Sequence, residues 1–171
     1  MRHPAGPESA ETKSVSEVDD SEPLLRLLWA EHDVRDGKIL PEAIPTSDLR
    51  GPDRGFSVDR ELLARREIME TPVEYQRPRA KKPEDRQTPF LSRIASAKDV
   101  RELKDSNGEK PFLVDPSPTP ATDRLPANLA HAEIKSAEKC SSKARQIERR
   151  QLLRSVLGPP VMFADFWAVD R

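Results

Sequence analysis

The chain has 171 residues, a length that suits one domain. Hydrophobic and charged residues each make up 35% of it, so the sequence does not predict a large buried core. No run of about 18 apolar residues occurs, which excludes a membrane span, and the single cysteine, Cys140, excludes a disulfide framework. The 17 prolines exceed the usual share of about 5% and predict irregular, exposed segments.

The formal net charge is −1, from 29 basic and 30 acidic residues, so no global field draws the chain toward nucleic acid or a membrane surface. Residues 1–22 hold two basic and six acidic residues, whereas residues 135–171 hold eight basic and four acidic ones. Ordinary solvated surface is the simplest explanation of this gradient. The start of the chain lacks the apolar stretch of a signal peptide, and one cysteine fits a reducing compartment, so we expect a cytoplasmic protein.

The first residues predict disorder. Residues 1–22 are rich in Pro, Ser, Glu and Asp and contain almost nothing to bury. We therefore expect a disordered acidic tail, followed by a single domain over residues 23–171.

Short strands are predicted early in the domain. The apolar run at residues 24–29 favours a strand, because Asp36-Gly37 soon signals a turn into a second extended piece at residues 38–40. Residues 56–60 alternate apolar and polar side chains, which is typical of a half-buried strand. The helix formers at residues 61–70 predict a helix that Asp59 caps and Thr71-Pro72 ends.

Two proline-rich stretches, residues 72–89 and 115–126, predict exposed loops. Between them, apolar spacing over residues 90–103 predicts a short amphipathic helix or two turns, and residues 111–114 predict a strand.

The last third of the chain predicts one strand and a helical region. Residues 128–134 suit a strand, and residues 135–157 have the longest helical pattern. A straight helix there would lack one clean apolar face, so we expect a bend near Arg149 or two separate segments. The aromatic-rich end, residues 161–171, is expected to dock on the body. This alternation of short strands and helices predicts a small α+β domain.

Signals for metal, cofactor and nucleophilic chemistry are weak. The three histidines are spread widely, Cys140 has no partner cysteine, and Glu31-His32-Asp33 and His131-x-Glu133 could each offer only two ligands. The six glycines form no phosphate-binding loop. We therefore expect neither a cofactor nor a metal.

One set of polar residues stands near the ends of predicted strands and is the candidate catalytic set: His32, Ser57, Asp59, Arg60 and His131. Arg60, together with Arg26, could hold a phosphate bidentately, and a histidine could transfer protons. The competing interpretation is structural: Asp59 caps a helix, Arg60 pairs on the surface and His131 bonds a carbonyl.

Binding of macromolecules is a further possibility. The basic residues between Arg77 and Arg86, and a basic arc over residues 135–154, could contact a nucleic-acid backbone, but aromatic residues for base stacking are scarce there. Proline-rich loops and an aromatic C-terminal segment suit docking on a protein partner.

Two short elements, GFSVDR at residues 55–60 and NLAHAEI at residues 128–134, occur together. They resemble elements of short uncharacterised bacterial proteins, in which Leu129 would be a proline. The resemblance implies no activity. It raises the joint interest of Ser57, Asp59, Arg60 and His131.

The sequence thus favours a non-enzymatic accessory or protein-interaction module. The alternative is a small enzyme or binder that holds a phosphate-bearing, nucleotide-type ligand with His32, Arg60 and His131.

Overall fold

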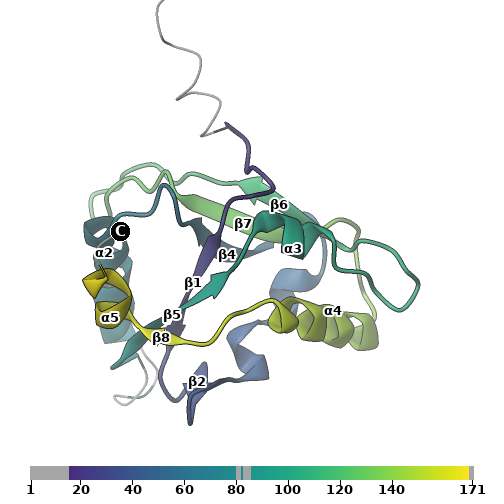
Figure 1. The fold of residues 1–171 in the computed structure, drawn as a ribbon, viewed down its shortest axis with the longest axis horizontal. Helices are drawn as coiled ribbons and strands as arrows, with labels where there is room; N and C mark the ends of the chain where they lie inside the picture. Colours follow the sequence, from purple (N-terminus) through teal and green to yellow (C-terminus); the bar gives the residue numbers. More distant parts are fainter. Residues whose placement is uncertain (1–15, 80–81, 83–85, 170–171) are drawn as a thin grey trace, which may run out of the picture.

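The computed structural model describes residues 16–79, 82 and 86–169 and shows an α+β domain, as the sequence predicts (Figure 1). Six strands form one antiparallel sheet in the order β6-β7-β4-β1-β5-β8. These strands are β1 (Leu24–Trp29), β4 (Gly55–Arg60), β5 (Pro89–Ile94), β6 (Phe112–Pro116), β7 (His131–Ser136) and β8 (Val161–Met162). The remaining pair, β2 (Val34–Arg35) and β3 (Lys38–Ile39), forms a small hairpin.

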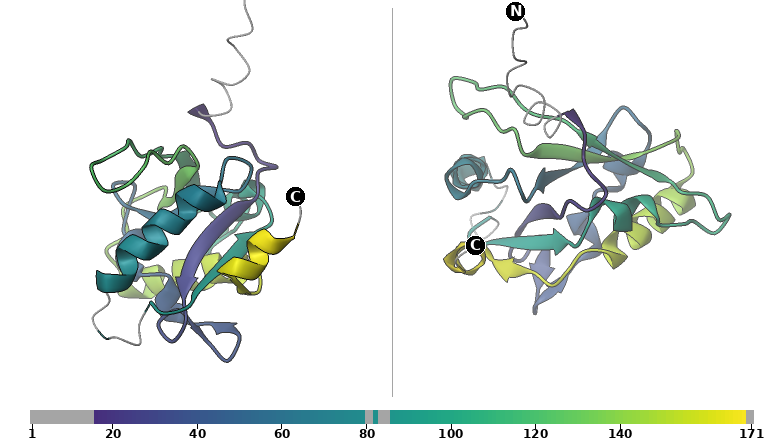
Figure 2. Two further views of the ribbon diagram at one scale, coloured as in Figure 1. Left: turned by 90° about the vertical axis from the view of Figure 1, so that its left-hand side faces the viewer. Right: turned by 45° about the horizontal axis from the view of Figure 1, so that its top comes forward.

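Four α-helices accompany the sheet: α2 (Arg66–Gln76), α3 (Ala97–Arg101), α4 (Lys143–Ser155) and α5 (Phe163–Ala168). Three short 3-10 helices complete the described elements: η1 (Pro41–Ala43), η2 (Thr46–Leu49) and η3 (Arg77–Arg79). In Figure 1 and in the right-hand view of Figure 2, α2 and α5 lie together at one end of the molecule, away from α4. None of the described helices has the length and apolar character that crossing a membrane requires.

The central strand β1 joins two unequal halves of the sheet. It pairs with β5 along six residues, but with β4 only at Leu24↔Arg60 and Leu25↔Asp59. Beyond that point the Arg26 side chain bridges the strands, because its Nη1 donates a 2.8 Å hydrogen bond to the Ser57 carbonyl. Its guanidinium also stacks 4.2 Å from the centre of the Phe56 ring. A side chain thus replaces part of the backbone ladder.

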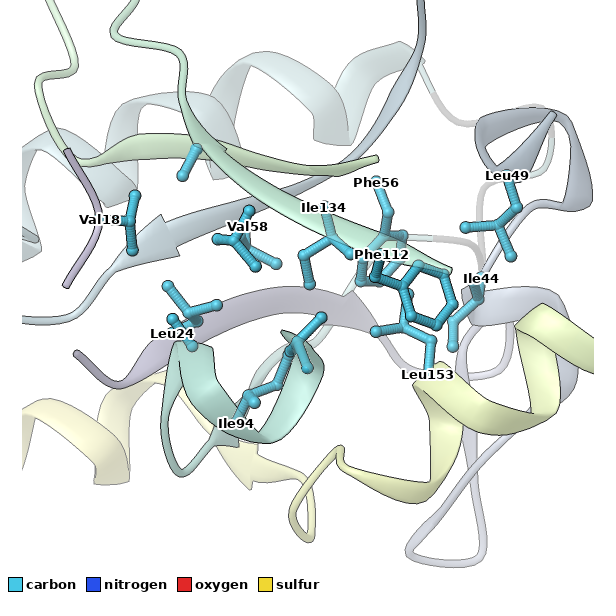
Figure 3. Close-up of a cluster of buried hydrophobic side chains, with 14 residues drawn as sticks. Val18, Leu24, Ile44, Leu49, Phe56, Val58, Ile94, Phe112, Ile134 and Leu153 are labelled. Atoms are coloured by element: carbon cyan, nitrogen blue, oxygen red, sulfur yellow. The ribbon is translucent and has the colours of Figure 1, made fainter. Parts of the chain in front are cut away.

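The main apolar core lies where the two halves of the sheet face one another. Figure 3 shows Val58 and Ile134 of β4 and β7 opposite Leu24 and Ile94 of β1 and β5, with Leu153 of α4 at one end. All of these side chains are buried. Because its apolar side chains are gathered and buried here, a chain with a modest apolar content still forms a core.

A second core forms between β1, β5 and the helices α2 and α5. It contains Leu25, Trp29, Met69, Val73, Leu91, Phe163 and Phe166. The aromatic C-terminal segment therefore docks on the body, as expected, through the buried rings of Phe163 and Phe166. Residues 170–171 lie outside the described part.

Four strand predictions are confirmed. The segments predicted at residues 24–29, 56–60, 111–114 and 128–134 correspond to β1, β4, β6 and β7. The turn and extended piece predicted around residues 36–40 correspond to the β2–β3 hairpin. Residues 115–126 are largely exposed, as predicted, although the first two belong to β6.

The predicted helix at residues 61–70 is wrong in its bounds. Residues 61–65 form turns, because the amides of Leu63 and Ala64 donate to the Arg60 carbonyl. Asp59 stays in β4 and caps nothing, and α2 runs from residue 66 through Pro72 to residue 76.

Residues 72–79 therefore belong to helices, and the predicted loop at residues 72–89 is too long. Proline does not end α2, because Met69 and Val73, one turn apart, are both buried in the second core. The Thr71 hydroxyl also donates to the Glu67 carbonyl within the helix. Residues 80–81 and 83–85 of that predicted loop lie outside the described part.

The predicted helix over residues 90–103 is a strand followed by a short helix. β5 pairs with β1 along its whole length, so cross-strand packing overrides the helical spacing. Only residues 97–101 form a helix, and the Ser96 hydroxyl accepts a hydrogen bond from the Asp99 amide at its start.

The helical pattern over residues 135–157 gives one helix, which continues through Arg149, rather than two separate helical segments. Residues 135–136 complete β7, and α4 begins at residue 143. Ser142 caps α4, because its hydroxyl accepts a 3.4 Å hydrogen bond from the Arg145 amide.

The end of the predicted disordered tail is part of the domain. Val18 and Glu22 are buried, and the Glu22 carboxylate accepts hydrogen bonds of 2.7 and 2.6 Å from Nε and Nη2 of Arg60. The sequence shows no apolar run here, because the segment is held by one buried apolar side chain, Val18, and by a paired charge. Residues 1–15 lie outside the described part of the chain.

We predict that Glu22→Gln lowers the free energy of unfolding by about 3–5 kcal/mol, because it leaves the buried Arg60 cation without its carboxylate. Urea unfolding of the full chain measures the loss. Glu102→Gln, which breaks the exposed pair with Lys110, should cost less than about 1 kcal/mol. Equal losses in the two variants would show that residues 16–22 do not stabilise the domain.

Candidate functional site

Three of the five predicted site residues lie on one face of the sheet. Asp59 is directly opposite His131, and Ser57 is directly opposite Glu133, in the β4–β7 pair. Residues in direct register point to the same side of a sheet, so these four side chains share a face. Together with Asp115 and Lys135 they form what we call the polar sheet face.

Most of the polar sheet face has an ordinary structural explanation. Lys135 Nζ lies 3.2 Å from a Glu133 oxygen and 3.8 Å from an Asp115 oxygen. Such half-exposed pairs contribute little to stability and bind nothing by themselves. The pair of Asp59 and His131 differs, because the Asp59 carboxylate is largely removed from water.

Asp59 is surrounded by polar and charged side chains. Burial raises the pKa of its carboxyl above the ordinary value of 3.8, while a hydrogen bond from Asn128 and the charges of His131 and Arg26 oppose that shift. The hydrogen bond runs from Asn128 Nδ2 to Asp59 Oδ1 over 2.8 Å. Asn128 is itself fixed, since its Oδ1 accepts from the Ala130 amide.

His131 is oriented by the segment that directly follows β6. Its Nδ1 lies 2.6 Å from the Ser117 carbonyl oxygen, which can only accept, so Nδ1 carries the proton. With the proton on Nδ1, Nε2 is an acceptor in the neutral form of the ring and a donor in the charged form. This arrangement can exchange a proton with a ligand, but it equally satisfies the carbonyl bond anticipated in the structural interpretation of His131.

Arg60 does not join this group. Its side chain is buried and held by Glu22, and its Nη2 also donates to the Glu17 carbonyl. It lies in register with Leu24, on the side of the main core. The predicted surface pairing of Arg60 is therefore wrong, and its guanidinium is already committed to the protein.

His32 is also separate. It follows β1 at the end farthest from Leu25, which pairs with Asp59. Its exposed ring contacts the adjacent Asp33, with Nδ1 2.6 Å from Oδ1. The structure therefore does not bring His32, Arg60 and His131 together as a phosphate site.

Arg26, the other cation considered for phosphate, has a structural position between β1 and β4. Burial lowers the pKa of its guanidinium, and the carboxylates of Asp33, Asp48 and Asp59 oppose this shift. Its Nε is buried without a hydrogen-bond partner in the part of the chain that the structure describes. The positive charge of Arg26 therefore compensates the negative charges of these three carboxylates within the fold.

Neither metal ligands nor a reactive thiol emerge from the described residues. Within residues 16–79, 82 and 86–169, no group of three or more His, Cys, Asp or Glu side chains is placed to hold a metal ion. Cys140 is buried and its Sγ contacts the Ser142 carbonyl, so it serves the turn before α4.

Two apolar surfaces were not anticipated from the sequence. One surrounds the edge strand β8, whose residues Val161 and Met162 are both exposed. The other is a cavity near Leu62 and Leu129, next to Asn128. The apolar residues were visible in the sequence, but nothing local to them indicates that they are left uncovered.

We predict that Asp59→Asn raises the free energy of unfolding near neutral pH. The folded state holds the Asp59 proton more tightly than the unfolded chain, so ionisation costs stability once the pH exceeds about 3.8. The variant removes this cost and keeps an oxygen for Asn128. The advantage should shrink as the pH falls toward 3.8.

Urea unfolding across this pH range measures the effect. Asp115→Asn, on the same face but half-exposed, is the matched control and should show a much smaller dependence on pH. A loss of stability in Asp59→Asn near neutral pH would contradict this description of the site.

Comparison with known proteins leaves the geometry as the basis for any functional conclusion. No family model matches the chain, and no curated protein and no solved structure matches it either.

Proposed function

We propose that this protein is a non-enzymatic interaction module that binds an extended segment of a partner protein along β8. The observation that carries the proposal is the difference between the two edges of the main sheet. Unprotected sheet edges tend to pair with further strands, and proteins usually block the edges that should stay free.

The β6 edge is blocked in several ways. Asp115 and Pro116 lie in the strand, and proline lacks the amide that an added strand would use. Arg101 covers the backbone as well, because its Nη2 donates a 3.1 Å hydrogen bond to the Val114 carbonyl. Such features discourage the addition of another strand at this edge.

The two residues of β8 include neither a charged residue nor a proline, although Pro159 and Pro160 come directly before them. Its two residues, Val161 and Met162, are apolar and 39% and 45% exposed. β8 pairs with β5 on one side, and no described strand pairs with its other side. An extended segment that lies beside β8 would satisfy the free backbone groups and cover both side chains.

Two cavities beside β8 could receive side chains of a bound segment. One, of about 280 Å³, is lined by Met162 and by residues of α2 and α5 that include Val73 and Phe163. The other, of about 440 Å³, is lined by Val161 together with Leu91 and Phe166. A bound segment would gain affinity from its backbone and specificity from side chains in these cavities.

A partner segment fits this surface better than a second copy of the chain. β8 is only two residues long, so two copies paired through it would share a very short ladder. Stable protein interfaces usually bury more than about 1,000 Å², which so short an edge does not supply by itself. A flexible peptide can use the edge and both cavities at once.

The test is selection from a phage-displayed library of short peptides against the full-length protein. We expect enriched peptides with alternating apolar residues, and we expect Met162→Lys to abolish their binding, because a charge at a sheet edge opposes strand addition. Leu113→Lys on β6 is the matched control, since Leu113 is 44% exposed and its substitution should leave binding unchanged.

Thermal unfolding checks that both variants are folded. Enriched peptides that bind Met162→Lys as well as the wild-type protein would overturn the proposal. A dimer in light scattering that Met162→Lys dissociates would also overturn it, because the occupant would then be a second copy.

A further inference from the structure

Another cavity lies between the start of α2 and the segment that precedes β7. It has a volume of about 270 Å³. Its walls come from residues 62–65, Ile68 and residues 127–129, and we call it the Leu129 cavity. It shares no lining residue with the two cavities at β8.

Two large apolar side chains in the lining of the Leu129 cavity are exposed. Leu62 is 72% exposed and Leu129 is 57% exposed. Single exposed apolar residues are common, but two large ones in the lining of one cavity form a surface that a ligand can cover. An apolar body of modest size would bury both.

The charge at the cavity has one sign. Arg65 is the only charged residue in its lining, and no Asp or Glu lines it. Arg65 is exposed, and among the residues that the structure describes no carboxylate forms an ion pair with it. A ligand that carries an anionic group would therefore meet a free guanidinium and no opposing carboxylate in the cavity wall.

The polar wall of the cavity is already rigid. Asn128 lines the cavity and is held on both sides of its amide group, by Asp59 and by the Ala130 amide. A fixed wall lowers the cost of ordering a site when a ligand binds. The Asp59 network therefore supports the shape of this cavity.

We propose that the Leu129 cavity binds an amphipathic monoanion of medium chain length, such as a linear carboxylate. The alkyl body lies between Leu62 and Leu129, and the anionic group pairs with Arg65. This site is independent of the proposed partner site at β8 and needs no partner protein.

Isothermal titration of the full-length protein with octanoate, octanol and octylammonium tests the proposal. We expect octanoate to bind more tightly than octanol, and octylammonium to bind more weakly than either, because only the anion pairs with Arg65. Arg65→Gln should lower octanoate affinity by about tenfold, the loss typical of a charge-assisted contact, and should leave octanol unchanged.

Three further variants make the result specific. Arg145→Gln, an exposed change on α4, should leave octanoate binding unchanged. Leu129→Ser should weaken octanoate and octanol alike. Met162→Lys at β8 should alter neither. Equal affinity for octanoate and octylammonium, an undiminished affinity in Arg65→Gln, or no octanoate binding at all would each overturn the proposal.

Discussion

The shape of the sheet depends on the unequal pairing of its central strand, β1. This strand pairs with β5 over six residues but with β4 over only two. Where β1 and β4 separate, Arg26 spans the gap to the Ser57 carbonyl and stacks on Phe56. The separation lets the two halves of the sheet face one another across the main core (Figure 3). The Arg26 side chain therefore takes the place of backbone hydrogen bonds that a longer β1–β4 ladder would have.

The same junction anchors the start of the described chain. Leu24 pairs with Arg60 in the short β1–β4 ladder, and Arg60 holds Glu22 by two hydrogen bonds. A buried ion pair adds little net stability compared with apolar packing, but loss of one partner is costly. The pair thus fixes the approach of residues 16–22 to the sheet more than it stabilises the core.

Each half of the sheet presents a different surface. The β6-β7-β4 half carries the polar sheet face and a blocked edge at β6. The β1-β5-β8 half is covered by α2 and α5, and its β8 edge is apolar and open. The proposed partner site therefore belongs to one half of the sheet, while the Leu129 cavity lies between α2 and the segment that precedes β7.

Much of this fold could be predicted from local sequence. The alternation at residues 56–60 indicated β4 correctly, and a period of two residues places Ser57 and Asp59 on one side of it. Long-range pairing was not accessible. The spacing over residues 90–103 suggested a helix, and only the register with β1 makes residues 89–94 a strand. Pro72 suggested a helix end, but the burial of Met69 and Val73 carries α2 through it.

The candidate sites were predictable to a smaller degree. Asp59 and His131 were singled out by their strand positions, yet only the β4–β7 register makes them neighbours. Arg60 gave no sign that its partner would be Glu22, 38 residues earlier. The openness of β8 and the free guanidinium of Arg65 depend on what the fold leaves uncovered, and local patterns do not encode that.

Amide hydrogen exchange, with and without a selected peptide, is the most direct test of the claim that β8 is the open edge of this sheet. Backbone amides that gain a partner exchange more slowly. When the peptide is bound, we expect slower exchange at whichever amide of Val161 and Met162 faces away from β5, and unchanged exchange in β6. Slower exchange in β6, or unchanged exchange in β8, would contradict the claim that β8 is the open edge.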